Sequence, residues 1–138
     1  MKPFQHFVQY YETDRMGITH HSNYIRIMEE ARSDYLRQLG FGYDRLEEMG
    51  IVSPVVSIQC DYKKPTTYAD TIEVHLTLLE LGAVKLRMGY TMLCRGEVVL
   101  TGVSAHGFLN RECKPISIKR QYPEFYQALA AQQSGVNS

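Results

Sequence analysis

The sequence predicts a single α+β domain in which one long helix packs against one antiparallel sheet. Two observations carry this prediction. Apolar residues recur at three- and four-residue steps over positions 22–39, as on the buried face of a helix. They recur at every second position in four later runs between positions 51 and 109, as in strands. A helix followed by consecutive strands with short connections gives an α+β layer arrangement.

The first half of the chain predicts one short strand and two helices. Residues 4–10 alternate weakly, so they predict a strand with Phe4, His6, Val8 and Tyr10 on one face. Ser22 or Asn23 can cap the start of the long helix, and Gly40 suits its end. Residues 43–49 predict a short helix that ends at Gly50. The long helix has one apolar stripe, which consists of Tyr24, Ile27, Met28, Ala31, Tyr35 and Leu39.

The second half predicts an antiparallel meander, because turn residues separate the four alternating runs. The breaks fall at 64–66, 81–83 and 95–97, and the last two are short enough for hairpins. The first run places Val56, Ile58, Cys60 and Tyr62 on one face. Residues 122–131 predict a terminal helix. We expect one domain over 1–131 and a disordered tail over 132–138, which is rich in Gln, Ser, Gly and Asn.

The composition limits the possible partners and the cellular compartment. The 138 residues include 15 basic and 15 acidic side chains, and this balance argues against a nucleic-acid-binding protein. Three cysteines without a Cys-x-x-Cys pair, no signal peptide and no long apolar run predict a cytoplasmic protein without membrane insertion. A single sheet leaves a face or an edge to be solvated or paired, so we expect at least a dimer.

The segment from Tyr11 to Tyr24 contains the candidate active site. It places the carboxylate of Asp14 a few residues before the start of the long helix, and Gly17 is available for a turn. The free N–H groups of a helix start favour negative charge. Thioester hydrolysis needs a carboxylate that attacks the carbonyl carbon or deprotonates water. It also needs N–H donors for the oxygen that becomes negative.

These residues resemble those of hotdog-fold thioesterases of the 4-hydroxybenzoyl-CoA thioesterase type. The resemblance rests on Tyr11, Thr13, Asp14, Gly17, His21, Tyr24, Glu29, Ala31, Arg32 and Gly40, and more loosely on 62–65 and 68–70. It implies a sheet wrapped around the central helix and sheets of two subunits joined edge to edge. It also implies an acyl-CoA substrate at the dimer interface, and homotetramers are common in this family. The expected activity is hydrolysis of a short-chain or aromatic acyl-CoA, with no cofactor and no metal.

The same resemblance assigns roles to individual residues. Asp14 is the expected nucleophile or general base, and the backbone N–H of His21 is the expected oxyanion donor. The His21 side chain either contacts the site or caps the helix, while Gly17 permits the turn that aims Asp14. Tyr24 lines the acyl pocket or only packs. Glu29 and Arg32, three residues apart on the helix, are expected to form a local ion pair.

Two positions differ from the family pattern. His20 stands where relatives have an aromatic residue before the motif histidine. The hairpin near 81–84 also lacks the arginine cluster that some relatives use for the CoA phosphates. Five basic residues remain as alternative phosphate ligands, of which Lys63, Lys64 and Lys85 are the preferred candidates, followed by Arg87 and Arg111.

Other kinds of site lack support in the sequence. The nearest match to a serine-hydrolase motif, residues 102–106, has His106 in place of the second glycine and lies in a strand pattern. The five histidines show no paired metal-ligand spacing. Two alternatives stay open. One is a hotdog hydratase or dehydratase that uses His21 with Asp14 or Glu29, and the other is a non-catalytic module that binds acyl thioesters.

Overall fold

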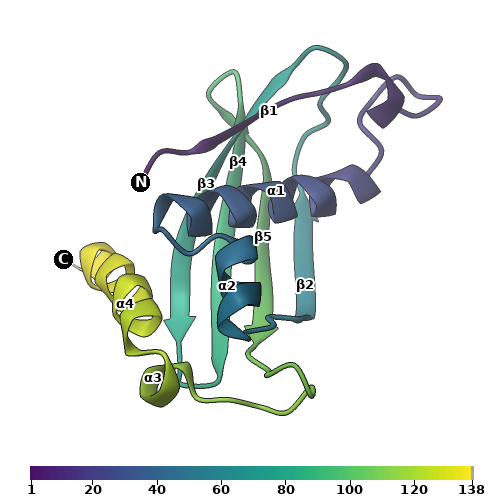
Figure 1. The fold of residues 1–138 in the computed structure, drawn as a ribbon. Coiled ribbons are helices and arrows are strands. Elements are labelled where there is room, and N and C mark those ends of the chain that lie inside the picture. The colour runs from purple at the N-terminus through teal and green to yellow at the C-terminus, as the bar shows by residue number, and fades with distance from the viewer. Residues whose placement is uncertain (138) are drawn as a thin grey trace.

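The computed structural model describes residues 1–137 and contains one five-stranded antiparallel sheet with four α-helices. The sheet order is β1-β3-β4-β5-β2, which leaves β1 and β2 at the two edges. The long helix α1 lies across one face of the sheet, with α2 below it (Figure 1). The strands are β1 Phe4–Phe7, β2 Val55–Tyr62, β3 Thr71–Leu81, β4 Lys85–Cys94 and β5 Glu97–Gly107. The helices are α1 Ser22–Gln38, α2 Tyr43–Met49, α3 Ile118–Gln121 and α4 Pro123–Asn137, with a 3-10 turn, η1, at Tyr10–Glu12.

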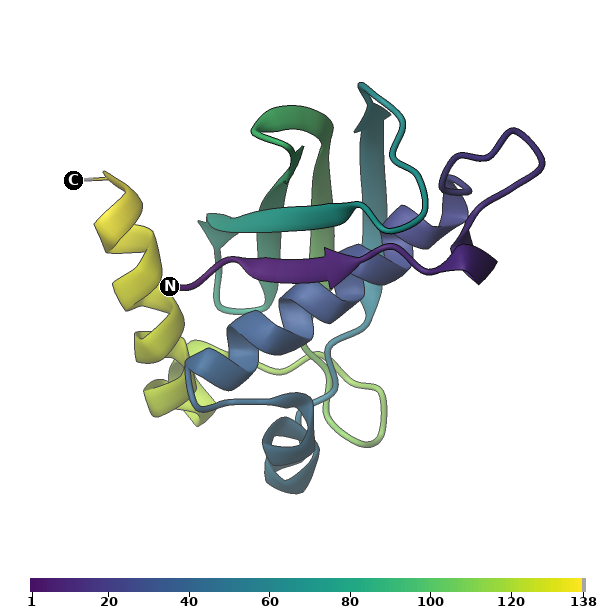
Figure 2. The ribbon, with the colours of Figure 1, turned by 90° about the horizontal axis from the view of Figure 1, so that it is seen from above.

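The core lies between α1 and the concave face of the sheet. Five of the six stripe residues predicted for α1 are buried, and Leu39 is half-buried at the end of the helix. Alternate residues of β4, namely Leu86, Met88, Tyr90 and Met92, face this helix side and are buried. Viewed from above, β1 runs alongside α1 (Figure 2). This arrangement confirms the predicted α+β class and the sheet wrapped around a central helix.

The predicted turns at Gly50 and at residues 95–97 are confirmed. Gly50 ends α2 with a φ of 88°, a left-handed conformation that glycine adopts without steric cost. Arg95 and Gly96 both have positive φ, at 52° and 77°, and connect β4 to β5 in the two-residue hairpin that suits the twist of the strands.

Three predictions about the elements differ from the structure. The predicted strand over 4–10 ends at Phe7, because the chain then turns into η1, and Tyr10 is exposed. In β2, a bulge between Val55 and Ser57 places Val55, in place of Val56, in phase with Ile58, Cys60 and Tyr62. Helix α4 extends through residues 132–137 of the predicted tail, and residue 138 lies outside the described residues.

Helix α4 closes the bottom of the core beside β3 (Figure 1). Phe125 is buried against Phe41, with ring centres 5.1 Å apart, and against Phe108, with ring centres 6.0 Å apart. Within residues 1–137, no helix is both long enough and apolar enough to cross a bilayer.

Candidate active site

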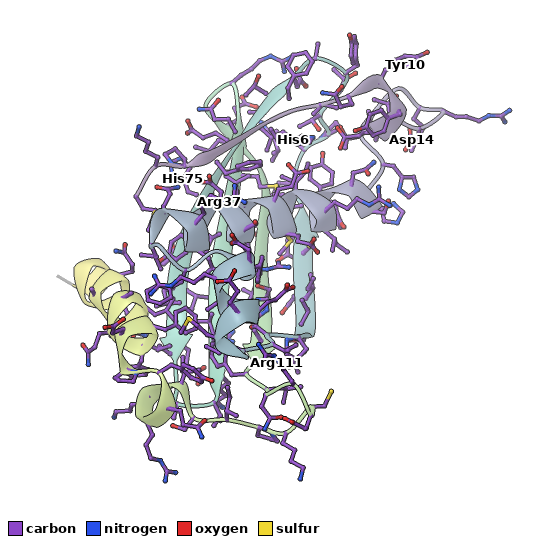
Figure 3. The ribbon with its side chains drawn as sticks, viewed as in Figure 1. His6, Tyr10, Asp14, Arg37, His75 and Arg111 are labelled. Carbon is purple, nitrogen blue, oxygen red and sulfur yellow. The ribbon has the colours of Figure 1, made fainter. Side chains whose placement is uncertain are left out.

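A short hairpin loop holds Asp14 just before α1. Thr13 and Thr19 form an isolated antiparallel bridge, and Asp14 N–H donates to the Ile18 carbonyl at 2.8 Å. The Gly17 N–H donates to the Asp14 carbonyl at 3.0 Å and closes a tight turn. Gly17 has a φ of 80°, which explains why glycine is needed there although no atom lies within 4 Å of an added Cβ. Figure 3 shows Asp14 at the end of the molecule where α1 starts.

The Asp14 carboxylate is held through one oxygen. Its Oδ1 accepts a hydrogen bond from the Met16 N–H at 2.8 Å. Among the described residues, Oδ2 has no hydrogen-bond partner, and the side chain is half-buried. One oxygen therefore fixes the orientation of the carboxylate, and the other is available to water or to a substrate.

The start of α1 differs from the predicted capping by Ser22 or Asn23. The Ser22 N–H donates to His20 Nδ1 at 3.2 Å, while the Asn23 amide donates to the Glu12 carbonyl at 2.8 Å. His21 occupies the position before the first helical residue, and its side chain caps no N–H. Its ring stacks on His20 with centres 4.3 Å apart. Predicting the cap from residue type alone was wrong because the preceding histidine supplies the acceptor.

The peptide groups at His21 leave one donor open. The His21 carbonyl accepts a hydrogen bond from the Tyr62 hydroxyl at 3.1 Å, so β2 fixes the helix start. Among residues 1–137, no acceptor lies within hydrogen-bond distance of the His21 N–H. This amide can therefore donate to the oxygen of a bound ligand.

Asp14 and His21 line the same surface cleft, which has a volume of about 320 Å³. One wall is the loop around Met16 and Ile18, and the other is the segment after β2. Tyr24 is buried at the cleft, where its hydroxyl is 2.8 Å from Thr66 Oγ1 and its ring centre is 5.6 Å from that of Tyr62. Ten residues line the cleft: Asp14, Met16, Ile18, Thr19, His21, Tyr24, Tyr62, Lys63, Lys64 and Pro65.

The three predicted phosphate-binding lysines separate into two groups. Lys63 and Lys64 lie in the cleft, although Lys64 also forms an ion pair with Glu97 at 2.7 Å. Lys85 is opposite Gly107, at the other end of the sheet from Tyr62, which is opposite Leu100. Its ammonium lies 3.7 Å from Glu80. Within one chain, antiparallel pairing therefore places Lys85 away from Asp14, and its role as a CoA contact stays a prediction.

A polar network behind the cleft attaches the loop to the sheet edge and to α1. Glu12 is buried, and its carboxylate accepts from the Gln9 N–H at 2.7 Å and lies 2.8 Å from His6 Nε2. The other ring nitrogen of His6 lies 3.2 Å from Glu30 on α1. The Glu12 carbonyl also accepts from His20 N–H at 2.8 Å. These contacts position the segment between β1 and α1 that contains Asp14.

The predicted ion pair between Glu29 and Arg32 is wrong. Arg32 is buried on the core side of α1, and its guanidinium donates to the Tyr90 hydroxyl at 3.2 Å. Glu29 is exposed. Residues three apart on a helix share a face only in part, and the sheet contact determined which way Arg32 turned.

Sequence reasoning missed the threonines that support the site. Thr19 Oγ1 lies 2.7 Å from Thr66 Oγ1, and the Thr67 hydroxyl donates to the Gly17 carbonyl at 2.8 Å. Thr66 and Thr67 directly follow Pro65 in the connection after β2, and this turn position was the only sign of their role in the sequence.

For metals, the described part of the chain holds no cluster of three histidine, cysteine or carboxylate side chains able to bind an ion.

The fold and this site define a class of protein, and the similarity of the chain to known proteins shows which family it is. The chain belongs to the Thioesterase-like superfamily, whose family model matches residues 8–132. This match confirms the predicted family and the hotdog fold.

Individual relatives cover nearly the whole chain. YneP of Bacillus subtilis, named provisionally as an acyl-CoA thioesterase, is 37% identical over 123 residues, covering 88% of this chain and 89% of YneP. The solved DHNA-CoA thioesterase of Staphylococcus aureus superposes with a TM-score of 0.93 at 30% identity, covering 99% of this chain and 93% of its own. A solved gentisyl-coenzyme A thioesterase gives a TM-score of 0.81 at 25% identity, covering 88% and 99%.

Proposed function

We propose that this protein hydrolyses the thioester of a short-chain or aromatic acyl-CoA to the free acid and CoA. It is an acyl-CoA thioester hydrolase, with Asp14 as its nucleophile or general base. One observation carries the proposal: the accessible Oδ2 of Asp14 and the open N–H of His21 border the same cleft. The membership in the family and the thioesterase names of its relatives support the same activity.

The two groups divide the chemistry between them. In one route, Asp14 deprotonates a water that attacks the carbonyl carbon, and in the other Oδ2 attacks this carbon and forms an anhydride that water then cleaves. In both routes the carbonyl oxygen becomes negative, and the His21 N–H at the start of α1 stabilises it. When this tetrahedral species collapses, the C–S bond breaks, and the CoA thiolate leaves with its electron pair and takes up a proton; in the second route this step yields the anhydride that water then cleaves.

The shape of the cleft favours an aromatic acyl group. Two aromatic residues, Tyr24 and Tyr62, line one wall with their rings edge to face, and Met16 and Ile18 add apolar surface on the other. The two structural relatives are named for DHNA-CoA and gentisyl-coenzyme A. Lys63 and Lys64, at the mouth of the same cleft, are the proposed contacts for CoA phosphates.

We expect a homodimer or homotetramer built on the edge strand β2. This strand pairs with β5 on one side only, and Val55, Val56 and Tyr62 expose much of their apolar surface. Edge-to-edge pairing of two copies would satisfy the open backbone groups and would place a second subunit beside Tyr62. We also assign the protein to the cytoplasm, because Cys60, Cys94 and Cys113 are all free thiols.

A screen of wild-type protein against short, long and aromatic acyl-CoAs tests the proposal. Release of free thiol, followed with a thiol reagent, is expected with at least one aromatic substrate. A change in enoyl-thioester absorbance without thiol release would instead indicate a hydratase or dehydratase. Saturable CoA binding without turnover of any substrate would indicate a binding module.

The hydratase alternative has less structural support than hydrolysis. It needs a histidine paired with a carboxylate, and within residues 1–137 the His21 ring forms no hydrogen bond or ion pair with Asp14 or Glu29. The ring instead stacks on His20 and lies edge-on to Tyr62, with centres 6.3 Å apart.

A further inference from the structure

A second polar site lies inside the protein, away from the Asp14 cleft. It is a small cavity between α1, α2 and the inner face of β4 and β5, and α4 closes it with Phe125. The cavity has a volume of about 10 Å³, which limits its occupant to a single small ion or molecule. Its polar lining consists of Arg32, Tyr43, Ser53 and His106, and its other walls are apolar.

Arg32 brings an uncompensated positive charge to this cavity. Its residue is only 4% exposed, and no carboxylate of the described chain lies within ion-pair distance of it. Burial lowers the pKa of Arg32, but the Tyr90 and Tyr43 phenols raise it, and the balance lies above its usual value. The guanidinium is therefore charged, and a buried charge without a counter-ion is strongly unfavourable.

The Arg32 side chain has an unpaired donor in its most buried part. One terminal nitrogen donates to the Tyr90 hydroxyl at 3.2 Å. The Nε atom is fully buried and has no partner anywhere in the described residues. An unsatisfied guanidinium N–H of this kind costs more than a neutral one, so a missing acceptor is expected beside it.

A chain of hydrogen bonds turns His106 into a second donor. Because Tyr90 accepts from Arg32, its own proton is free for Ser104 Oγ, which lies 2.5 Å away. Ser104 then uses its proton toward His106 Nε2 at 2.7 Å. The opposite direction would leave the proton of the buried Tyr90 hydroxyl without an acceptor. With Nε2 accepting, the neutral ring of His106 carries its proton on Nδ1.

We propose that this cavity binds one small monovalent anion of chloride size, which serves as the counter-ion of Arg32. The Arg32 Nε–H and the His106 Nδ1–H are its donors, with the Tyr43 hydroxyl as a third. A cavity whose polar lining includes one cation and no carboxylate suits an anion better than a neutral water. Half-buried Tyr43 and Ser53 mark the side from which the ion enters. The site does not depend on the thioesterase activity.

Thermal unfolding in two sodium salts of equal ionic strength tests the proposal. Protein dialysed into gluconate, which is too large for the cavity, is titrated with chloride. We expect a saturable rise in Tm, of about 10 °C at a hundredfold excess over the dissociation constant. The rise should be absent in Arg32→Met and unchanged in the control Arg37→Met, which removes an exposed arginine from the same helix. Equal rises in Arg32→Met and wild type would overturn the proposal.

A crystal soaked in sodium bromide gives a test that needs no variant. An anomalous peak in the cavity, at hydrogen-bonding distance from Arg32 Nε, is the expected result. An ordered water without anomalous signal at bromide concentrations that saturate the Tm change would overturn the assignment. This arm decides the question even if Arg32→Met does not fold.

Discussion

Two polar centres on α1, the Asp14 cleft and the Arg32 cavity, are built in opposite ways. At the start of the helix, backbone groups of a short loop hold an accessible carboxylate, whose one hydrogen bond within residues 1–137 comes from the Met16 N–H. Further along the helix, side chains alone hold a buried guanidinium through Tyr90, Ser104 and His106. An open site leaves an oxygen available for chemistry, whereas a closed one joins helix to sheet. Changes at the first should therefore alter rate, and changes at the second should alter stability.

Acid should destabilise the protein through the Arg32 cavity. Burial and the charge of Arg32 lower the pKa of His106 from its ordinary 6.5 to about 4. Between these two pKa values, His106 binds a proton in the unfolded chain but not in the folded chain. The free energy of unfolding has its full value above pH 6.5 and falls by up to about 3 kcal/mol as the pH drops toward 4. Urea unfolding of wild type and His106→Gln at pH 7 and pH 5, in gluconate and without chloride so that no bound anion offsets the charge of Arg32, measures the loss.

Two variants show whether His106 is the cause of that loss. His106→Gln should flatten the pH dependence between 6.5 and 4, whereas His75→Gln, which changes an exposed histidine on β3, should leave it unchanged. An equally steep slope in His106→Gln would assign the acid sensitivity to other groups.

Ser104→Ala should lower the free energy of unfolding by about 2 kcal/mol. The change leaves the buried Tyr90 hydroxyl and His106 Nε2 without their shared partner. Chemical denaturation gives the value, and kcat for an acyl-CoA should stay within about twofold because Ser104 does not line the Asp14 cleft. Ser57→Ala, at an exposed position on β2, is the control. A large loss of kcat with unchanged stability would break the proposed division between the two centres.

Gly17→Ala should lower stability by about 1 kcal/mol and should also lower kcat. The glycine has a φ of 80°, which strains any other residue, and its turn orients Asp14. Gly96→Ala is a closely matched control, since Gly96 has a φ of 77° and equally open surroundings but lies in the β4–β5 hairpin and does not line the Asp14 cleft. Both variants should lose similar stability in thermal unfolding, and only Gly17→Ala should lose activity.

The smallest expected effect is on KM, and it distinguishes Lys63 from Lys85. Lys63→Ala should raise KM for acyl-CoA by about two- to fivefold, because it removes one of the two proposed phosphate contacts, at an exposed position. Lys85→Ala should leave KM unchanged if binding follows the positions in a single chain. A KM effect from Lys85 instead would show that a second subunit brings this residue to the site.

The fold was predictable from the sequence where local pattern and burial agree. The stripe on α1 and the alternation in β4 reflect one buried face each, so their periods gave the correct elements. Tyr10 and Val56 lie where this relation fails, at a chain turn and at a bulge in β2. Periodicity reports which residues share a face, but not whether that face is covered.

The site was predictable only where it is local in the chain. Asp14, Gly17 and His21 lie within eight residues, so their proximity follows from sequence, and the structure places Asp14 and His21 in one cleft. Contacts across the fold, such as Tyr62 with the His21 carbonyl or Arg32 with Tyr90, depend on strand register. Lys85 illustrates the same limit, because its distance from Asp14 is fixed by the pairing of β4 with β5.

The central claim is that the Asp14 carboxylate performs the hydrolysis, and single-turnover kinetics of Asp14→Asn tests it most directly. Asparagine keeps an acceptor for the Met16 N–H, so the loop and CoA binding should persist, as checked by Tm and by equilibrium binding. We predict that CoA release from the bound acyl-CoA slows by about 10²- to 10⁴-fold, while Asp44→Asn, at an exposed position on α2, remains as fast as wild type. Release from Asp14→Asn at the wild-type rate, with binding intact, would contradict the account.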